Sequence, residues 1–338
     1  MEQTFSWLFD LWLGKPVWMW ALFLTLVGGL LAFDLGVLGR RRAARTDGAG
    51  QEIGVKASLG LSAFYIAIAL LFGGWVWLAL GPESGMAYLT GFAVEKALAL
   101  DNVFVISVIF AALAVPRHLQ HRVLFWGILG VIVLRGLMIG LGAALVSNFA
   151  WVMWVFGAFL LLTGLRLLFV KGGHGAPDLE RHPVVRALRR VMPISPRLDG
   201  ERFVTRLPDA AGRMRLHATP LLLALLLVEA ADLVFAVDSI PAIFAITQDP
   251  FIVYTSNIFA ILGLRALYFA LDALIHRFSA LKPALALVLV FIGGKIFYNQ
   301  FYGKLDPAIS LGVTLIILGG GVALSLWRTR GKGARPAA

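Results

Sequence analysis

The chain has 338 residues, of which 59% are hydrophobic and 14% are charged, and its mean hydropathy is +0.85. A soluble domain is usually nearer half apolar and a quarter charged, so this composition argues against a soluble or disordered chain and predicts a membrane protein. The absence of cysteine excludes disulfides, thiolate metal sites and cysteine nucleophiles.

Nine segments are apolar enough to cross a bilayer, which takes about 20 residues. Because irregular backbone cannot face lipid, each segment is predicted to be a helix. We therefore expect an all-α bundle of nine transmembrane helices that forms a single transmembrane domain over residues 1–338. In chain order the segments are 17–38, 55–80, 86–114, 122–146, 150–170, 218–246, 251–274, 283–300 and 309–327.

The basic residues explain the net charge of +11 and orient the chain. Of the 30 lysines and arginines, 23 flank the predicted spans on one side, only Lys15 and Lys304 lie on the other, and five lie within spans. Cytoplasmic flanks are enriched in Lys and Arg, so the N-terminus is predicted outside and the C-terminus in the cytoplasm. This distribution is a topology signal, and a nucleic-acid partner is not expected.

The only long loop, 171–217, is predicted to be cytoplasmic. It contains five prolines and a short amphipathic run from Val184 to Met192. We expect a partly ordered linker that lies on the bilayer surface.

Two stretches of the sequence match each other. Glu95 and Asp101-Asn102 in the third span align with Asp232 and Asp238-Ser239 in the sixth, and Arg135 aligns with Arg265 further on. Gly164-Leu-Arg166 then aligns with Gly293-Gly-Lys295, so the landmarks keep their order at offsets of 137, 130 and 129 residues. Each repeat, 86–170 and 218–300, holds three spans, which predicts inverted topology as in many secondary transporters.

Charged residues within the spans predict a buried site. Each charge at the bilayer centre costs about 2.5–3.5 kcal/mol on insertion scales, so these side chains are expected to face the bundle interior. All six histidines lie outside the deep parts of the spans, which leaves oxygen ligands suited to Mn²⁺, Mg²⁺ or Ca²⁺. The candidate ligands are Asp101, Asp238, Glu95, Asp232, Glu229 and Asn102.

Other polar residues are expected to support this site or balance its charge. For Arg135, Arg265 and Lys295, pairing with the acids to hold helices together is the favoured role. Asn257 is interpreted equally well as a ligand or as an ordinary interhelical hydrogen bond. Pro241, three residues after Asp238, predicts either an opened helix with a free carbonyl or a plain kink. The supporting set is Lys96, Ser239, Asn257, Arg135, Arg265 and Lys295.

The two acidic motifs also carry a resemblance. Glu95-Lys96 with Asp101-Asn102, the stretch from Glu229 to Thr247, and Thr255-Ser-Asn257 with Leu264-Arg265 together resemble the TerC family, and the length resembles its Alx branch. The resemblance covers about 20–330 and implies a bacterial inner-membrane protein of the LysE-like transporter superfamily. It also implies a link to manganese export and tellurite resistance, with the five motif acids as functional residues.

We therefore expect a Mn²⁺ exporter in which the metal is the transported substrate and no tightly bound cofactor is present. Protons are the expected counter-ions, because metal binding displaces protons from crowded carboxylates. A transporter for Ca²⁺ or another cation, and a non-transporting scaffold in stress resistance, are the alternatives. An intramembrane enzyme is disfavoured because no HExxH motif is present. A retinal Schiff base on Lys295 is disfavoured because its repeat counterpart is Arg166. The oligomeric state cannot be predicted from the sequence.

Overall fold

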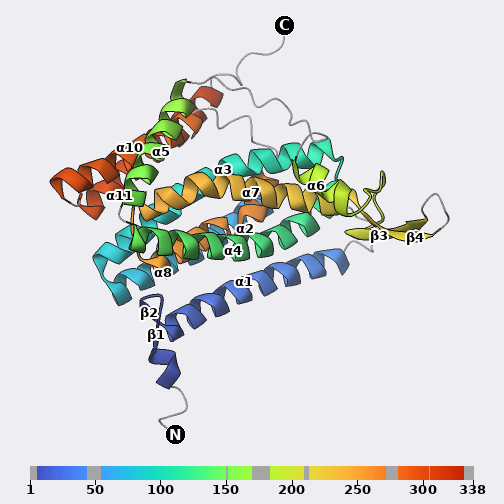
Figure 1. The fold of residues 1–338 in the computed structure, drawn as a ribbon, viewed down its shortest axis with the longest axis horizontal. Coiled ribbons are helices and arrows are strands. Elements are labelled where there is room, and N and C mark those ends of the chain that lie inside the picture. Colours follow the sequence, from blue (N-terminus) through green and yellow to red (C-terminus); the bar gives the residue numbers. More distant parts are fainter. Residues whose placement is uncertain are drawn as a thin grey trace.

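The protein is seen in a computed structural model that describes residues 6–43, 55–149, 151–169, 183–208, 213–271, 281–303 and 305–330. Several of its long helices run side by side in roughly one direction, while others lie obliquely to them at one end (Figure 1). The helices are α1 Val17–Ala43, α2 Val55–Leu80, α3 Pro82–Ala112, α4 Arg117–Asn148, α5 Trp151–Phe169, α6 Pro183–Val191, α7 Pro220–Phe244, α8 Pro250–Ile261, α9 Leu264–Leu271, α10 Leu281–Tyr302 and α11 Pro307–Arg330.

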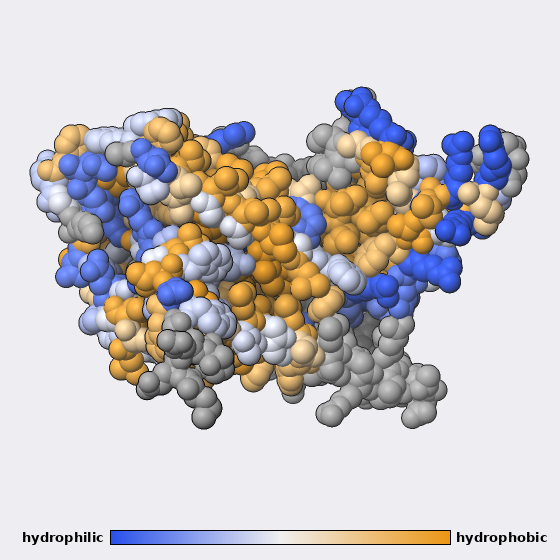
Figure 2. Space-filling view, turned by 60° about the horizontal axis from the view of Figure 1, so that its bottom comes forward, coloured by the Kyte–Doolittle hydropathy of each residue, from blue (hydrophilic) through white to orange (hydrophobic). Residues whose placement is uncertain are grey.

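The helices form a multi-pass membrane protein. By length and composition, seven of the described helices can cross a bilayer: α1, α2, α4, α5, α7, α10 and α11. The third predicted span is the 31-residue helix α3, which carries several charged residues, and the seventh is split into shorter helices. Figure 2 shows apolar residues gathered across the middle of one face, with hydrophilic residues towards its two ends. This distribution is typical of a protein surrounded by lipid.

The seventh predicted span is not one continuous helix. α8 ends at Ile261 and α9 begins at Leu264, because Gly263 adopts φ +81°, a left-handed conformation that glycine accepts without a steric penalty. A Cβ at this position would also collide with the ring of Tyr65. By contrast, α7 continues through Pro241 and ends three residues later at Phe244.

The long loop that was predicted to be cytoplasmic contains more regular structure than expected. The amphipathic run forms α6, whose Val185 and Leu188 are buried in the same apolar cluster as residues of α7. The strands β3, Val204–Pro208, and β4, Met214–Ala218, pair as an antiparallel hairpin. Residues 170–182 and 209–212 lie outside the described part of this loop. Near the N-terminus, a 3-10 helix, Ser6–Phe9, precedes a short hairpin of β1, Leu11–Trp12, and β2, Lys15–Pro16.

The helices of the two matched stretches pack in a reciprocal pattern. α3 contacts α8, and α7 contacts α4. α10 contacts α3, and α5 contacts α7, while α5 and α10 form the most extensive helix pair. α3 and α7, which carry the acidic motifs, also contact each other. The interior between α3, α4, α7 and α8 therefore receives side chains from both matched stretches.

Candidate functional site

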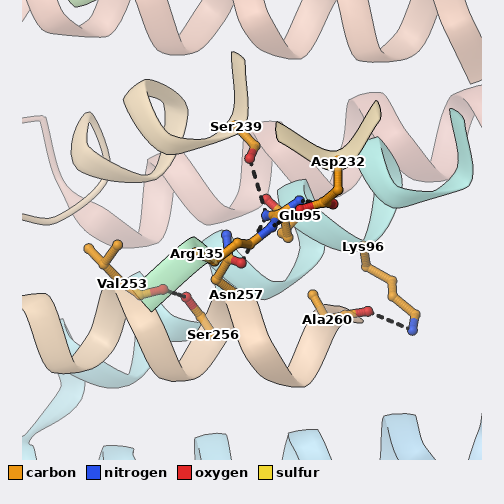
Figure 3. Close-up of polar contacts among 9 residues, drawn as sticks. All are labelled: Glu95, Lys96, Arg135, Asp232, Ser239, Val253, Ser256, Asn257 and Ala260. Carbon is orange, nitrogen blue, oxygen red and sulfur yellow. Dashed lines mark hydrogen bonds and ion pairs between the residues drawn. The ribbon is translucent and has the colours of Figure 1, made fainter. Parts of the chain in front are cut away.

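A single arginine lies at the centre of the candidate site. Arg135 is on α4, and its side chain is only 1% exposed. Its Nε and Nη2 donate to the two carboxylate oxygens of Asp232 on α7, at 3.1 and 2.9 Å. This two-pronged geometry is the strongest that arginine forms with a carboxylate. Arg135 thus joins α4 to α7 deep inside the protein (Figure 3).

The third nitrogen of the guanidinium contacts three more helix-borne oxygens. Nη1 of Arg135 donates to Glu95 on α3, to Asn257 Oδ1 on α8 at 2.8 Å, and to Ser239 Oγ on α7 at 3.3 Å. The guanidinium of Arg135 on α4 is therefore surrounded by oxygens from α3, α7 and α8, which belong to two carboxylates, an amide and a hydroxyl. We call the set Glu95, Asp232, Ser239 and Asn257 the oxygen cage.

The oxygen cage satisfies Arg135 but does not use all its own polar atoms. Glu95 Oε2 and Asn257 Nδ2 are buried and have no hydrogen-bond partner in the described part of the chain. The cage contains two carboxylates and encloses one guanidinium, so the cage and Arg135 together have a formal charge of −1 when both acids are ionised. Its carboxylates could therefore accept a further or a different cation.

A small cavity adjoins the oxygen cage. Its volume is about 40 Å³, and Asp232 of the cage forms part of its wall. Asn102 on α3 also lines it, and the buried Oδ1 of Asn102 has no hydrogen-bond partner among the described residues. A water molecule needs about 10–15 Å³ measured in this way, so the cavity can hold a small ion with a water molecule.

Glu229 lies one helical turn before Asp232 on α7. Both of its carboxylate oxygens are buried without a hydrogen bond from the described residues. The carboxylate fits against α4 because Gly127 and Gly130 have no side chain, and a Cβ at Gly130 would collide with it. Glu229 thus packs against α4, the helix that carries Arg135, without pairing with Arg135.

Lys96 follows Glu95 on α3 but points away from Arg135 (Figure 3). Its Nζ donates to the carbonyl oxygens of Ala260 at 3.0 Å and Leu262 at 3.4 Å. These carbonyls lie at the C-terminal end of α8, where a helix leaves its last C=O groups unsatisfied. Lys96 therefore caps the broken seventh span, a role that the sequence did not predict.

Of the remaining predicted site residues, only Lys295 has a described side chain. Lys295 on α10 is buried, and its Nζ donates to Ser310 Oγ on α11 at 3.0 Å. The side chains of Asp101, Asp238 and Arg265 lie outside the described residues, although their backbones are helical. Among the side chains that are described, no group of three acids or histidines could hold a metal ion. The ligand assignment therefore remains a prediction.

Two features of the site were missed from sequence. The first is the packing of Glu229 against Gly127 and Gly130. Its only sign in the sequence is that these two glycines are three residues apart in the fourth predicted span, which places them on one helix face. The break at Gly263 is signalled only by a glycine within an apolar run.

The fold and the site together define the class of the protein: a polytopic helical membrane protein with a buried cluster of charged residues contributed by several helices. The pattern of the TerC family of integral membrane proteins matches residues 80–333. The chain belongs to this family.

Curated relatives align over nearly their whole length. An "Uncharacterized membrane protein" of Myxococcus xanthus is 46% identical over 312 residues, covering 92% of this chain and 93% of the relative. The "Putative membrane-bound redox modulator Alx" of Escherichia coli K12 is 44% identical over 313 residues, covering 90% and 92%. An "Uncharacterized membrane protein" of Rickettsia bellii is 43% identical over 310 residues, covering 91% and 97%. No solved structure matches the chain.

Proposed function

We propose that the protein transports a divalent metal ion across the bacterial inner membrane and exports Mn²⁺ from the cytoplasm. The observation that carries this proposal is that carboxylate, amide and hydroxyl oxygens from three helices converge on one buried cation, the guanidinium of Arg135. Such oxygens are the ligands that Mn²⁺, Mg²⁺ and Ca²⁺ prefer. The adjoining cavity between Asn102 and Asp232 supports the proposal, because it leaves room for an ion.

The proposed transporter has nine spans and two inverted repeats, and contacts between α5 and α10 support the repeats. A Cβ on Gly164 would meet the backbone of Ala286 and Val290, while one on Gly293 would meet the backbone of Gly157 and Leu161. Adding 129 to 157, 161 and 164 gives 286, 290 and 293, so each contact has its counterpart in the other repeat.

The reciprocal packing of α3 on α8 and α7 on α4 follows the same relation. Inverted repeats that rock against each other expose a midplane site to alternate sides of the membrane. Glu95 and Asp232 occupy matched positions of these repeats and contact the same guanidinium. The proposed site therefore lies where the two repeats meet.

In the proposed cycle the inward-facing protein binds Mn²⁺ with Asp101, Asp238 and part of the group of Glu95, Asp232, Glu229 and Asn102. Metal binding requires deprotonated carboxylates, so protons are the proposed counter-ions. The redox name of the Escherichia coli relative would fit an indirect effect of metal balance. Thiol chemistry is excluded for this chain because it contains no cysteine.

The proposal is tested in cells that lack their own Mn²⁺ exporters. Wild-type protein should lower cytosolic Mn²⁺, whereas Asp101→Asn and Asp238→Asn should not. Glu83→Gln is the matched control, because Glu83 is an exposed acid in the first turn of α3. Wild-type export by the Asp101→Asn and Asp238→Asn proteins would refute the ligand assignment. Calorimetry with Mn²⁺, Mg²⁺, Ca²⁺ and Zn²⁺ separates Mn²⁺ from the alternative cations, and binding of none of them would refute transport.

A further inference from the structure

Resting on the proposed function, we propose that Arg135 is a tethered substitute for the transported metal: its guanidinium fills the oxygen cage when the site is empty and moves to Glu229 when Mn²⁺ binds.

The contacts of Arg135 differ from those of an ordinary structural ion pair. One guanidinium donates five hydrogen bonds to the oxygen cage, which combines two carboxylates, an amide oxygen and a hydroxyl. An arginine that only joined two helices would need a single carboxylate partner. The arrangement instead matches the donor set of a divalent-cation site with a protein cation inside it.

The physical need for such a cation follows from the bilayer. An uncompensated charge at its centre costs about 2.5–3.5 kcal/mol, and the cage holds Glu95 and Asp232 together. A transporter that releases its metal outside must return without it, with both carboxylates still buried. The guanidinium of Arg135 offsets one of their two negative charges during this return step, and a counter-transported proton can offset the other. The guanidinium must leave the cage when Mn²⁺ brings two positive charges.

The structure offers the displaced guanidinium a second partner, Glu229 of α7, which packs against the helix that carries Arg135. Glu229 packs against Gly127 and Gly130 of α4, and both its carboxylate oxygens lack a hydrogen bond from the described residues. Helical side chains lean towards the N-terminus of their helix, which is the direction from Arg135 to Gly130. The cavity of about 40 Å³ that touches Asp232 is lined by Ile128 and Val131 of α4, so space exists on this side of Arg135.

The test compares binding, net transport and exchange in purified protein. Calorimetry measures Mn²⁺ affinity, and proteoliposomes measure both net Mn²⁺ flux and the exchange of radioactive Mn²⁺ between two Mn²⁺-containing sides. Exchange needs only the loaded transporter to reorient, whereas net flux also needs the empty one to return. Arg135→Gln should bind Mn²⁺ at least tenfold more tightly, keep exchange and lose at least nine-tenths of net flux. Arg166→Gln, an exposed arginine in the last turn of α5, should match wild type.

A double-mutant cycle tests the role of Glu229. Glu229→Gln should weaken Mn²⁺ binding in the wild-type background, because the displaced guanidinium loses its partner. In the Arg135→Gln background the same change should have no effect. An equal loss in both backgrounds would make Glu229 a direct ligand and overturn this part of the inference.

Should Arg135→Gln not fold, Arg135→Lys serves in its place, because it keeps the charge but loses the planar fork. Its Mn²⁺ affinity should rise by a smaller factor. The inference is overturned if a folded Arg135 variant binds Mn²⁺ no more tightly than wild type, or if it loses exchange and net flux in parallel. In either case, Mn²⁺ transport by the wild-type protein would still support the proposed function. If wild-type protein neither binds nor moves Mn²⁺, the proposed function fails and the inference fails with it.

Discussion

At the scale of single residues, the contacts around Arg135 are unequal in strength. Asp232 accepts two of its hydrogen bonds at 2.9 and 3.1 Å, whereas Ser239 accepts one at 3.3 Å. Removing one partner of a buried ion pair leaves a charge without compensation, which costs much more than losing a neutral hydrogen bond. The stability of the protein should therefore depend far more on Asp232 than on Ser239.

We predict that Asp232→Asn lowers the free energy of unfolding by about 3–5 kcal/mol. Ser239→Ala should lower it by about 0.6 kcal/mol, a typical value for a hydrogen bond between membrane helices. Thermal unfolding in detergent, followed by tryptophan fluorescence, measures both. Glu83→Gln at the exposed start of α3 is the control and should match wild type within about 0.5 kcal/mol. Equal losses for the two cage variants would show that the charge of Asp232 is not what stabilises the site.

Lys96 allows a second prediction at this scale. Its ammonium caps the carbonyls of Ala260 and Leu262 at the break between α8 and α9, and hydrogen bonds from charged groups contribute about 1.5–3 kcal/mol. Lys96→Met should lower stability by this amount and increase hydrogen exchange of amides in α8 and α9. Lys15→Met removes the pairing of Lys15 with Asp249 at the partly exposed start of α8 and should cost under about 1 kcal/mol. A Lys96 variant as stable as wild type contradicts the capping role.

At the scale of helices, α5 and α10 pack backbone against backbone. A Cβ on Gly164 would lie 2.8 Å from the carbonyl oxygen of Ala286, and one on Gly293 would lie 2.9 Å from that of Gly157. Neither contact can relax by a side-chain movement, because backbone atoms are involved. Both glycines are therefore needed for close approach of the two helices.

Gly164→Ala and Gly293→Ala should each lower the free energy of unfolding by about 1–3 kcal/mol, the usual cost of overpacking. The two effects should be similar, because the two contacts correspond to each other if the proposed repeats are present. Gly294→Ala is a matched control, since nothing lies within 4 Å of an added Cβ there, and alanine in an open helix position should stabilise by about 0.4–1 kcal/mol. Urea or thermal unfolding of the three variants measures the pattern, and a loss at only one of the two contact glycines would argue against symmetric packing.

The helices and strands show which parts of the fold could be predicted from the sequence. Hydropathy places helix in all nine predicted segments, because lipid allows little else. The correspondence of Glu95 and Asp232 was visible in the sequence as matched positions of two proposed repeats. Which cation they share was not, because it depends on how α4 is rotated about its axis. The break at Gly263 leaves hydropathy unchanged, and the β3–β4 hairpin lies in a loop without apolar periodicity, so both required the structure.

At the scale of the whole molecule, two ion pairs agree with the predicted topology. Lys15 near the N-terminus pairs with Asp249 at the start of α8, at 2.9 Å, and the charge distribution places both outside. Arg122 at the beginning of α4 pairs with Glu201 in the long loop, at 3.1 Å, and both are predicted to be cytoplasmic. Each pair thus joins segments that the basic flanks assign to the same side of the membrane.

The absence of cysteine makes this topology directly testable, because any introduced thiol is unique in the chain. In intact cells an impermeant maleimide should label Asp306→Cys, between α10 and α11, within minutes, while Arg206→Cys in β3 should react only after the membrane is opened. Both positions are exposed in the structure, so a difference between them reports on the side of the membrane and not on burial. The two loops are separated by three of the nine proposed spans, which are α7, the α8–α9 pair and α10. An odd number of crossings places the two thiols on opposite sides, whereas counting the broken α8–α9 segment as a non-crossing element places them on the same side. Equal labelling of both thiols in intact cells would therefore contradict the nine-span arrangement and the inverted relation of the repeats that depends on it.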